Sequence, residues 1–383
     1  MDDHQLPDTT PPREALRAPT GLARCRHQAA HPLRAVGHWL ARVDPGTHRC
    51  VKGLRLVTAY GIAAALGALH DITRDVPGGA VLGTLAAAFA LWASVHEART
   101  TRPESSRDLA LLCVAIGLGA AVYVALSPLA DRFGRGGHEA TLVIGAFLVG
   151  YMKRFFGVLG AGLGSMFFIG QLYAYSVHLA PADLPAIGVA VLIAALASIV
   201  PRMLSGPAER PVLLAALSAV PAGVARRWQP EFVMGLQAAT ASAVVVVLNA
   251  LIGLEESVWA VTAAVYVVAG SASGTMQRVR RRILGTLVGV PLGLVFLPLA
   301  EHAPLVAWAV AALAMVIYAM ALPERYDVAC GAFAFVLIVT LAMNGIHSVG
   351  FLFARAWETL IGGALGLAAA MFIFPLRAIQ PDK

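Results

Sequence analysis

Long apolar segments recur along this chain and constrain its fold more than any other feature. Most have about the 20 residues that a helix needs to cross the hydrocarbon core of a bilayer. Soluble domains carry about 25% charged residues, whereas this 383-residue sequence has 13% and is 58% hydrophobic. We therefore expect an all-α integral membrane protein with about twelve transmembrane helices. The segments are Val51–Leu69, Gly78–Val95, Leu109–Leu129, Ala140–Tyr151, Phe155–Val177, Leu184–Leu204, Phe232–Leu254, Val258–Gly274, Ile283–Leu299, Leu305–Leu322, Val328–Met343 and Val349–Pro375.

The segments fall into two sets of six, and the polar stretches around them give the domain boundaries. The fourth segment is short, and the basic pair Lys153-Arg154 separates it from the fifth by a tight turn. The predicted domains are a basic cytoplasmic tail (1–50), a first six-helix set (51–204), a cytoplasmic connection (205–230), a second six-helix set (231–376) and a short cytoplasmic tail (377–383).

Two stretches outside these sets have helical patterns but are too short to cross the membrane. His31–Val43 is compatible both with a helix on the membrane surface and with a disordered basic tail. Pro211–Val224 is apolar and carries Pro221, so we expect an interfacial helix there. If it crossed the membrane, every later segment would be inverted.

The distribution of basic residues predicts the orientation. Cytoplasmic loops of membrane proteins are enriched in Lys and Arg. With a cytoplasmic N-terminus and twelve spans, almost all of the 29 Lys and Arg residues lie on the cytoplasmic side. The exceptions are Arg74, Arg132 and Arg135 on the outer side and Arg355 inside the last span. We therefore expect both termini on the cytoplasmic side of the membrane.

The two sets share a layout, which predicts an internal repeat. In each set an arginine-bearing inner loop, Arg99–Arg107 or Arg278–Arg282, precedes a third span with spaced glycines. Six spans per set is an even number, so the repeats have parallel orientation and a pseudo-two-fold axis along the membrane normal. Two unrelated alanine-rich halves would share part of this layout, and the sequence does not separate these explanations.

The stretch Gln277–Gly293 combines a basic cluster with a small-residue helix face. Its arginines lead into Gly285-Thr286, and Gly289 and Gly293 follow at intervals of four, so the glycines share one face. Such a face lets another helix approach closely. Arg282 lies nearest to this glycine face. It either lies at the entrance of the transport path or anchors the helix at the cytoplasmic surface. Lys52 and Arg55 likewise suit either an anion funnel or anchoring.

The second half resembles the fusaric acid resistance protein family of bacterial aromatic-acid exporters and, more distantly, the plant aluminium-activated malate transporters. Three motifs carry the resemblance over about Phe232–Arg377. The first half matches only in layout, and large cytoplasmic domains found in many members have no counterpart here. The resemblance implies proton-driven efflux or anion transport. The motifs are Trp259-Ala260-Val261-Thr262, Arg282-x-x-Gly285-Thr286-x-x-Gly289 and Arg355-x-x-Glu358-Thr359-x-x-Gly362.

Arg355 and Glu358 are the sharpest candidates for chemistry. They lie one turn apart in an apolar span, where a charge costs at least about 2.5–3.5 kcal/mol, so they must face protein or water. Arg355 suits recognition of a carboxylate substrate, and Glu358 suits proton uptake and release. A structural ion pair explains them equally. Trp259 either stacks on an aromatic substrate or lies at the membrane interface.

These observations favour an inner-membrane efflux transporter for small organic anions, with aromatic carboxylic acids as the substrate class and the proton gradient as the energy source. A passive organic-anion channel and a non-transporting docking protein are the alternatives. We expect no enzymatic activity, cofactor, metal site or nucleic-acid partner, because no phosphate loop, nucleophile motif or ligand spacing occurs. The expected partners are the substrate, protons and the lipid bilayer, with a homo-oligomer or a periplasmic adaptor left open.

Overall fold

The chain divides into two compact units, Met1–Thr47 and His48–Lys383. Both amphipathic stretches discussed above, His31–Val43 and Pro211–Val224, lie outside the residues that the structure describes. Every regular element in the described part of the chain is a helix. The computed structural model describes residue 44 and residues 48–98, 101–134, 136–205, 229–254, 257–269, 271–322, 324–343 and 349–376.

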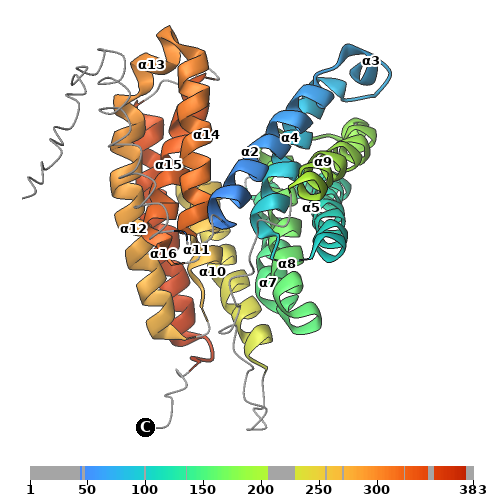
Figure 1. Ribbon diagram of the computed structural model, residues 1–383. Coiled ribbons are helices and arrows are strands. Elements are labelled where there is room, and N and C mark those ends of the chain that lie inside the picture. The colour runs from blue at the N-terminus through green and yellow to red at the C-terminus, as the bar shows by residue number, and fades with distance from the viewer. Residues whose placement is uncertain are drawn as a thin grey trace, which may run out of the picture. The chain divides into compact units, whose positions relative to one another are not determined.

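The first half runs from α2 to α9, coloured blue to green in Figure 1. Each of its six predicted segments contains a main helix, and the fourth is the shortest. Gly157, near the start of α8, has a φ of 57° and interrupts that helix. The elements are α2 (His48–Gly67), α3 (His70–Thr73), α4 (Gly79–His96), α5 (Arg102–Ala130), η1 (Asp131–Phe133), α6 (Gly137–Ala140), α7 (Leu142–Tyr151), α8 (Lys153–Ser176), η2 (Pro181–Asp183) and α9 (Leu184–Leu204).

The second half runs from α10 to α16, coloured yellow to red in Figure 1. Its six predicted segments also each contain a main helix, although the boundaries of the second and third differ from the prediction. The elements are α10 (Pro230–Ile252), α11 (Ser257–Val267), α12 (Ala272–Val295), α13 (Leu297–His302), α14 (Pro304–Ala321), α15 (Tyr326–Met343) and α16 (Val349–Phe372).

Seven helices of the described residues are long and apolar enough to cross a membrane, which confirms an all-helical, multi-span membrane protein. Shorter apolar helices cover Ser257–Val267, Tyr326–Ala342 and Trp357–Phe372. The seven are Arg49–Gly67, Gly79–His96, Arg102–Phe133, Lys153–Ser176, Pro181–Leu204, Pro230–Ile252 and Pro304–Ala321.

The same pattern of contacts between helices occurs in both halves. In the first half α2 packs on α4, α5 on α8, α7 on α8, and α9 on α2, α4 and α5. In the second half α10 packs on α11, α12 on α15, α14 on α15, and α16 on α10, α11 and α12. The most extensive contacts between the halves are α7 with α10 and α2 with α14.

Small residues allow the close contacts between the halves. A Cβ atom added at Gly150 of α7 would lie 2.3 Å from the backbone nitrogen of Gly235 in α10. At Gly53 of α2 it would lie 2.9 Å from a side-chain atom of Val316 in α14. Close backbone approach through small residues is the usual way in which membrane helices associate.

A buried ion cluster joins the ends of α2, α4 and α9. Glu97, directly after α4, is ion-paired with Arg55 of α2 and Arg202 of α9. Ser105 of α5 donates a hydrogen bond to Glu97, and Lys52 donates to the carbonyl of Glu97 at 2.7 Å. These contacts hold Arg55 inside the helix bundle and not on a surface that an anion funnel would require.

The arginine cluster of Gln277–Gly293 lies in a helix, which corrects the prediction of an inner loop at Arg278–Arg282. α12 begins at Ala272, where the side chain of Ser271 caps it by accepting a hydrogen bond from the backbone N–H of Gly274 at 3.1 Å. Arginine is a good helix former, so nothing stops the helix between this cap and the apolar run. The arginines therefore lie within the first turns of α12 itself.

The eighth predicted segment, Val258–Gly274, is also corrected, because it does not form one helix. α11 ends at Val267, and α12 starts within the last residues of the predicted segment. Two contacts fix the break: Arg278 donates to the carbonyl oxygen of Val268 at 3.0 Å, and the hydroxyl of Thr275 accepts from the N–H of Ala269 at 3.0 Å. Polar groups of α12 thus satisfy the backbone where α11 stops.

Candidate functional site

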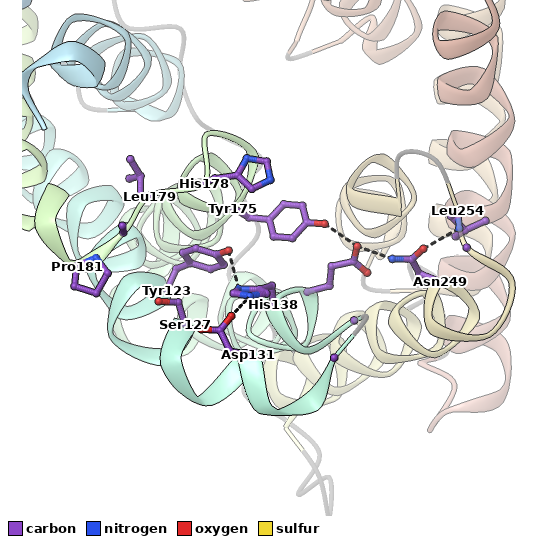
Figure 2. A pocket seen from close by; sticks show the side chains of 15 residues that line it. Tyr123, Ser127, Asp131, His138, Tyr175, His178, Leu179, Pro181, Asn249 and Leu254 are labelled. Carbon is purple, nitrogen blue, oxygen red and sulfur yellow. Dashed lines mark hydrogen bonds and ion pairs between the residues drawn. The ribbon is translucent and has the colours of Figure 1, made fainter.

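A polar pocket of about 590 Å³ lies where residues of both halves meet (Figure 2). The first half supplies Tyr123 from α5, His138 and Glu139 from α6, and Tyr175 from the end of α8. The second half supplies Asn249 from the end of α10. Carboxyl, imidazole, phenol and amide groups therefore line a single cavity.

Glycines shape the turn that brings α6 into this pocket. Gly134 and Gly136 have φ angles of 62° and 89°, which residues with a side chain rarely adopt. A Cβ at Gly137 would lie 2.2 Å from the carbonyl oxygen of Ala130, so the turn folds tightly back onto α5. The next residues, His138 and Glu139, are consequently held at the pocket.

Glu139 is buried, with 3% of its surface exposed, and its two carboxylate oxygens differ. Oε1 accepts hydrogen bonds from the hydroxyl of Tyr175 at 2.9 Å, from Nδ2 of Asn249 at 2.7 Å and from the hydroxyl of Ser257. Oε2 is buried and has no hydrogen-bond partner. Figure 2 shows Tyr175 and Asn249 reaching the same carboxylate from different elements.

The orientation of the Asn249 amide follows from a second contact. Its Oδ1 accepts a hydrogen bond from the backbone N–H of Leu254 at 2.8 Å. Because the oxygen is engaged there, the NH₂ group points to Glu139 and donates. Gly253, with a φ of 67°, ends α10 and allows the chain to turn back for this contact.

A second chain of hydrogen bonds lines the same pocket. Nε2 of His138 lies 2.8 Å from Oδ1 of Asp131, and Nδ1 of His138 lies 3.2 Å from the hydroxyl of Tyr123. A neutral imidazole satisfies both contacts if Nε2–H donates to the carboxylate and the phenol donates to Nδ1. The side chains of His138 and Asp131 are 36% and 69% exposed, so this chain connects solvent with the pocket.

The sequence alone assigned no role to His138 or Glu139. The available signal was a lone acid after a glycine-rich turn and directly before an apolar segment. Its hydrogen-bond donors come from three other helices, which a single sequence does not bring together.

Arg282 lies in α12, and its guanidinium contacts α15. Nη1 donates to the hydroxyl of Tyr326 at 3.4 Å, whereas Nε is buried and has no hydrogen-bond partner. Among the described residues no carboxylate forms an ion pair with Arg282. A buried N–H donor beside a positive charge is suited to an anion.

The three glycines predicted to share a packing face all lie against α15. A Cβ atom at Gly285 would lie 2.3 Å from the carbonyl oxygen of Asp327, at Gly289 2.2 Å from that of Gly331, and at Gly293 2.7 Å from Ile338. The neighbouring Thr286 is half-buried. An apolar cavity of about 460 Å³ adjoins Gly285 and Gly289 between α12, α14 and α15.

Trp259 and Glu358 lie on helices that pack together, α11 and α16. A Cβ at Gly362, one turn after Glu358, would lie 2.0 Å from the carbonyl oxygen of Ala260, the residue after Trp259. Glu358 is 1% exposed and Trp259 is half-buried. Arg355 lies in α16, but its side chain is outside the described part of the chain.

α12 joins this group of helices, because Gly363 of α16 lies against Val279. The structure thus brings the helices of all three sequence motifs into one packed group. None of the predicted binding or coupling residues lines the pocket at Glu139.

The same region carries the relationship to known proteins. Residues 240–369 match the family model described as fusaric acid resistance protein-like. This fusaric acid resistance protein-like region covers about a third of the chain and contains α11, α12, α14 and α15 in full. It includes all the predicted site residues and confirms the resemblance drawn from the motifs. Comparisons with curated proteins and with solved structures each gave no match.

Proposed function

We propose that this protein is a transporter of the bacterial inner membrane that exports small organic anions, with aromatic carboxylates as the substrate class, in exchange for protons. The observation that carries the proposal is Arg282, a half-buried arginine whose buried Nε–H donor is unused, inside the fusaric acid resistance protein-like region. A carboxylate supplies both the negative charge and the acceptor that this group lacks.

In this proposal the chain crosses the membrane twelve times as two parallel six-helix repeats, with both termini in the cytoplasm. The helix contacts support the arrangement, because six pairings within the first half recur between the corresponding helices of the second. The two most extensive contacts between the halves correspond as well: the repeat relation that places α7 on α14 and α10 on α2 converts the α7–α10 contact into the α14–α2 contact. Transporters built from parallel repeats place their path at the interface between the repeats.

The substrate site would combine Arg282 with Arg355 and Trp259, and Glu358 would couple transport to protons. The packing of α11, α12 and α16 supports this grouping, since these helices carry all four residues. Arg355 would bind the carboxylate, and Trp259 would stack on the aromatic ring. Glu358, buried in a span, would carry the proton.

The test is efflux from proteoliposomes that contain the purified full-length protein, loaded with radiolabelled benzoate. An imposed pH gradient should drive benzoate movement, and dissipating the gradient should abolish it. Transport that ignores the pH gradient but follows an imposed voltage would instead indicate a passive channel. Glu358→Gln should stop gradient-driven exchange, whereas a channel would conduct with this substitution.

A further inference from the structure

We propose that Glu139 is a proton-binding site in the pocket between the halves, and that its ionised form clamps the halves together. The site is separate from the residues assigned above to substrate and coupling, and none of the sequence motifs includes it.

The asymmetry of the carboxylate shows where the proton would bind. Three donors converge on Oε1, which makes it the oxygen that carries the negative charge. Oε2 is buried, has no partner and faces no competing donor. A proton on Oε2 would turn Oε1 into a carbonyl oxygen, which is a weaker acceptor for its three donors.

The surroundings of Glu139 leave its charge without a cationic partner. Among the described residues no Lys or Arg forms an ion pair with it, and Ser257 and Asn249 offer only neutral donors. Among the described residues, the other titratable groups that line the same pocket are Tyr123 of α5, Asp131 of η1, His138 of α6, Tyr175 of α8 and His178 directly after α8. The geometry therefore leaves Oε2 of Glu139 as the oxygen that is open to a proton.

The pocket is better suited to a proton than to a metal ion. Hard cations such as Ca²⁺ take about six to eight oxygen ligands, whereas Glu139 has a single oxygen available. No cluster of three or more metal-binding side chains occurs in the described part of the chain. The half-exposed pair of His138 and Asp131 provides proton-exchanging groups at the same pocket.

The clamp follows from the origin of the donors. Tyr175 belongs to the first half, and Asn249 and Ser257 belong to α10 and α11 of the second. Ionised Glu139 therefore ties the end of α8 to the α10–α11 corner, beside the α7–α10 contact between the halves. Protonation would loosen this tie. Its use in transport rests on the proposed function, in which protons from outside enter as the anion leaves.

Proton binding can be measured by infrared titration of the full-length protein in lipid nanodiscs. The wild type should develop a protonated-carboxyl band as the pH falls, and Glu139→Gln should lose it. Glu104→Gln makes the same substitution at an exposed glutamate near the start of α5. This control variant should retain the band. Should the band persist unchanged in Glu139→Gln, the proposal is wrong.

A second variant keeps the test decisive if Glu139→Gln does not fold. Asn249→Ala removes one donor to the ionised carboxylate, so the band should appear at higher pH than in the wild type. An unchanged midpoint would contradict the role of Asn249.

The clamp has its own readout. Leu254→Cys places a thiol at the pocket, and its labelling by a membrane-impermeant maleimide is normalised to free glutathione at each pH. Labelling should accelerate as the pH falls and should be fast at every pH when combined with Glu139→Gln. If the labelling rate depended on pH in the same way in Leu254→Cys with and without Glu139→Gln, the proposed clamp would be wrong.

Neither measurement requires transport. A band that depends on Glu139 in a protein without benzoate efflux would refute the proposed function and leave the proton site in place. Benzoate efflux by a protein whose protonated-carboxyl band does not depend on Glu139 would refute the proton site and leave the proposed function in place.

Discussion

Oε1 of Glu97 lies 2.8 Å from Nε of Arg202, and these side chains are only 5% and 2% exposed. They are far apart in sequence, because Glu97 directly follows α4 and Arg202 lies in the last turn of α9. Arg55 of α2 lies 3.0 Å from the other carboxylate oxygen. One carboxylate therefore compensates two buried guanidinium groups and holds three helix ends together.

Glu97→Gln should destabilise the protein strongly, because it removes a buried negative charge that pairs with both Arg55 and Arg202. Breaking a buried ion pair by removing one partner costs about 3–5 kcal/mol. The measurement is thermal or denaturant unfolding of the purified protein in detergent. Glu104→Gln, at an exposed glutamate nearby, is the matched control and should change little. Equal stability of the two variants would show that water reaches the cluster.

Gly289→Ala should weaken the contact between α12 and α15. The added Cβ atom would lie 2.2 Å from the backbone of Gly331, which cannot rotate away. Overpacking of this kind costs about 1–3 kcal/mol. The control is Gly188→Ala in α9, where an added Cβ meets nothing within 4 Å, and the better helix propensity of alanine stabilises by up to about 1 kcal/mol. The two variants should shift the unfolding midpoint in opposite directions.

Arg282→Met should raise the KM for benzoate efflux. A hydrogen bond to a charged group contributes about 1.5–3 kcal/mol, which corresponds to roughly 10- to 150-fold in affinity. Arg282→Lys should recover only part of the loss, because it keeps the charge but not the planar set of donors. Arg280→Gln, at an exposed arginine of the same helix, serves as the control. A KM equal to that of the control would exclude Arg282 from the substrate site.

The contact between Arg49 and Glu324 should make stability depend on pH. The pKa of Glu324 is lowered below its ordinary value of 4.5, mainly by the hydrogen bond from Arg49 and secondly by the positive charge of Arg49. A lowered pKa means that the ion pair stabilises the fold above pH 4.5 and that this contribution is lost as the pH falls through the folded-state pKa. Glu324 is largely exposed, so the effect is small and screened by salt.

Unfolding of the wild type and of Glu324→Gln as a function of pH tests this contact. The difference between their melting temperatures should be present at neutral pH and low salt and should shrink at acid pH. A difference that stays constant across the pH range would mean that the contact does not act through charge.

Hydropathy predicted an all-helical protein with several membrane spans, because burial in lipid depends on apolar segments of about 20 residues, and seven described helices meet that criterion. It failed where polar contacts set the boundaries. The cap at Ser271 and the bond between Thr275 and Ala269 start α12 early, and both depend on single hydroxyl groups that an average over a long window conceals.

Candidate site residues could be singled out only in part, for a similar reason. Arg282, Trp259 and Glu358 were proposed because each stands out within an apolar stretch, and their roles stay predictions. Glu139 was not, because its neighbour His138 and the glycine-rich turn resemble an ordinary loop. Its donors, Tyr175, Asn249 and Ser257, are distant from it in sequence and gain meaning only when the helices are packed.

The early end of α11 has a mechanical consequence. An eleven-residue helix rises only about 16 Å, roughly half of a 30 Å hydrocarbon core, so its terminal backbone groups need partners from elsewhere. Arg278 and Thr275 of α12 provide them. A displacement of α12 that left α11 behind would strand these groups. We therefore expect α11 and α12 to move together, so that Trp259 of α11 keeps its position relative to Arg282 of α12.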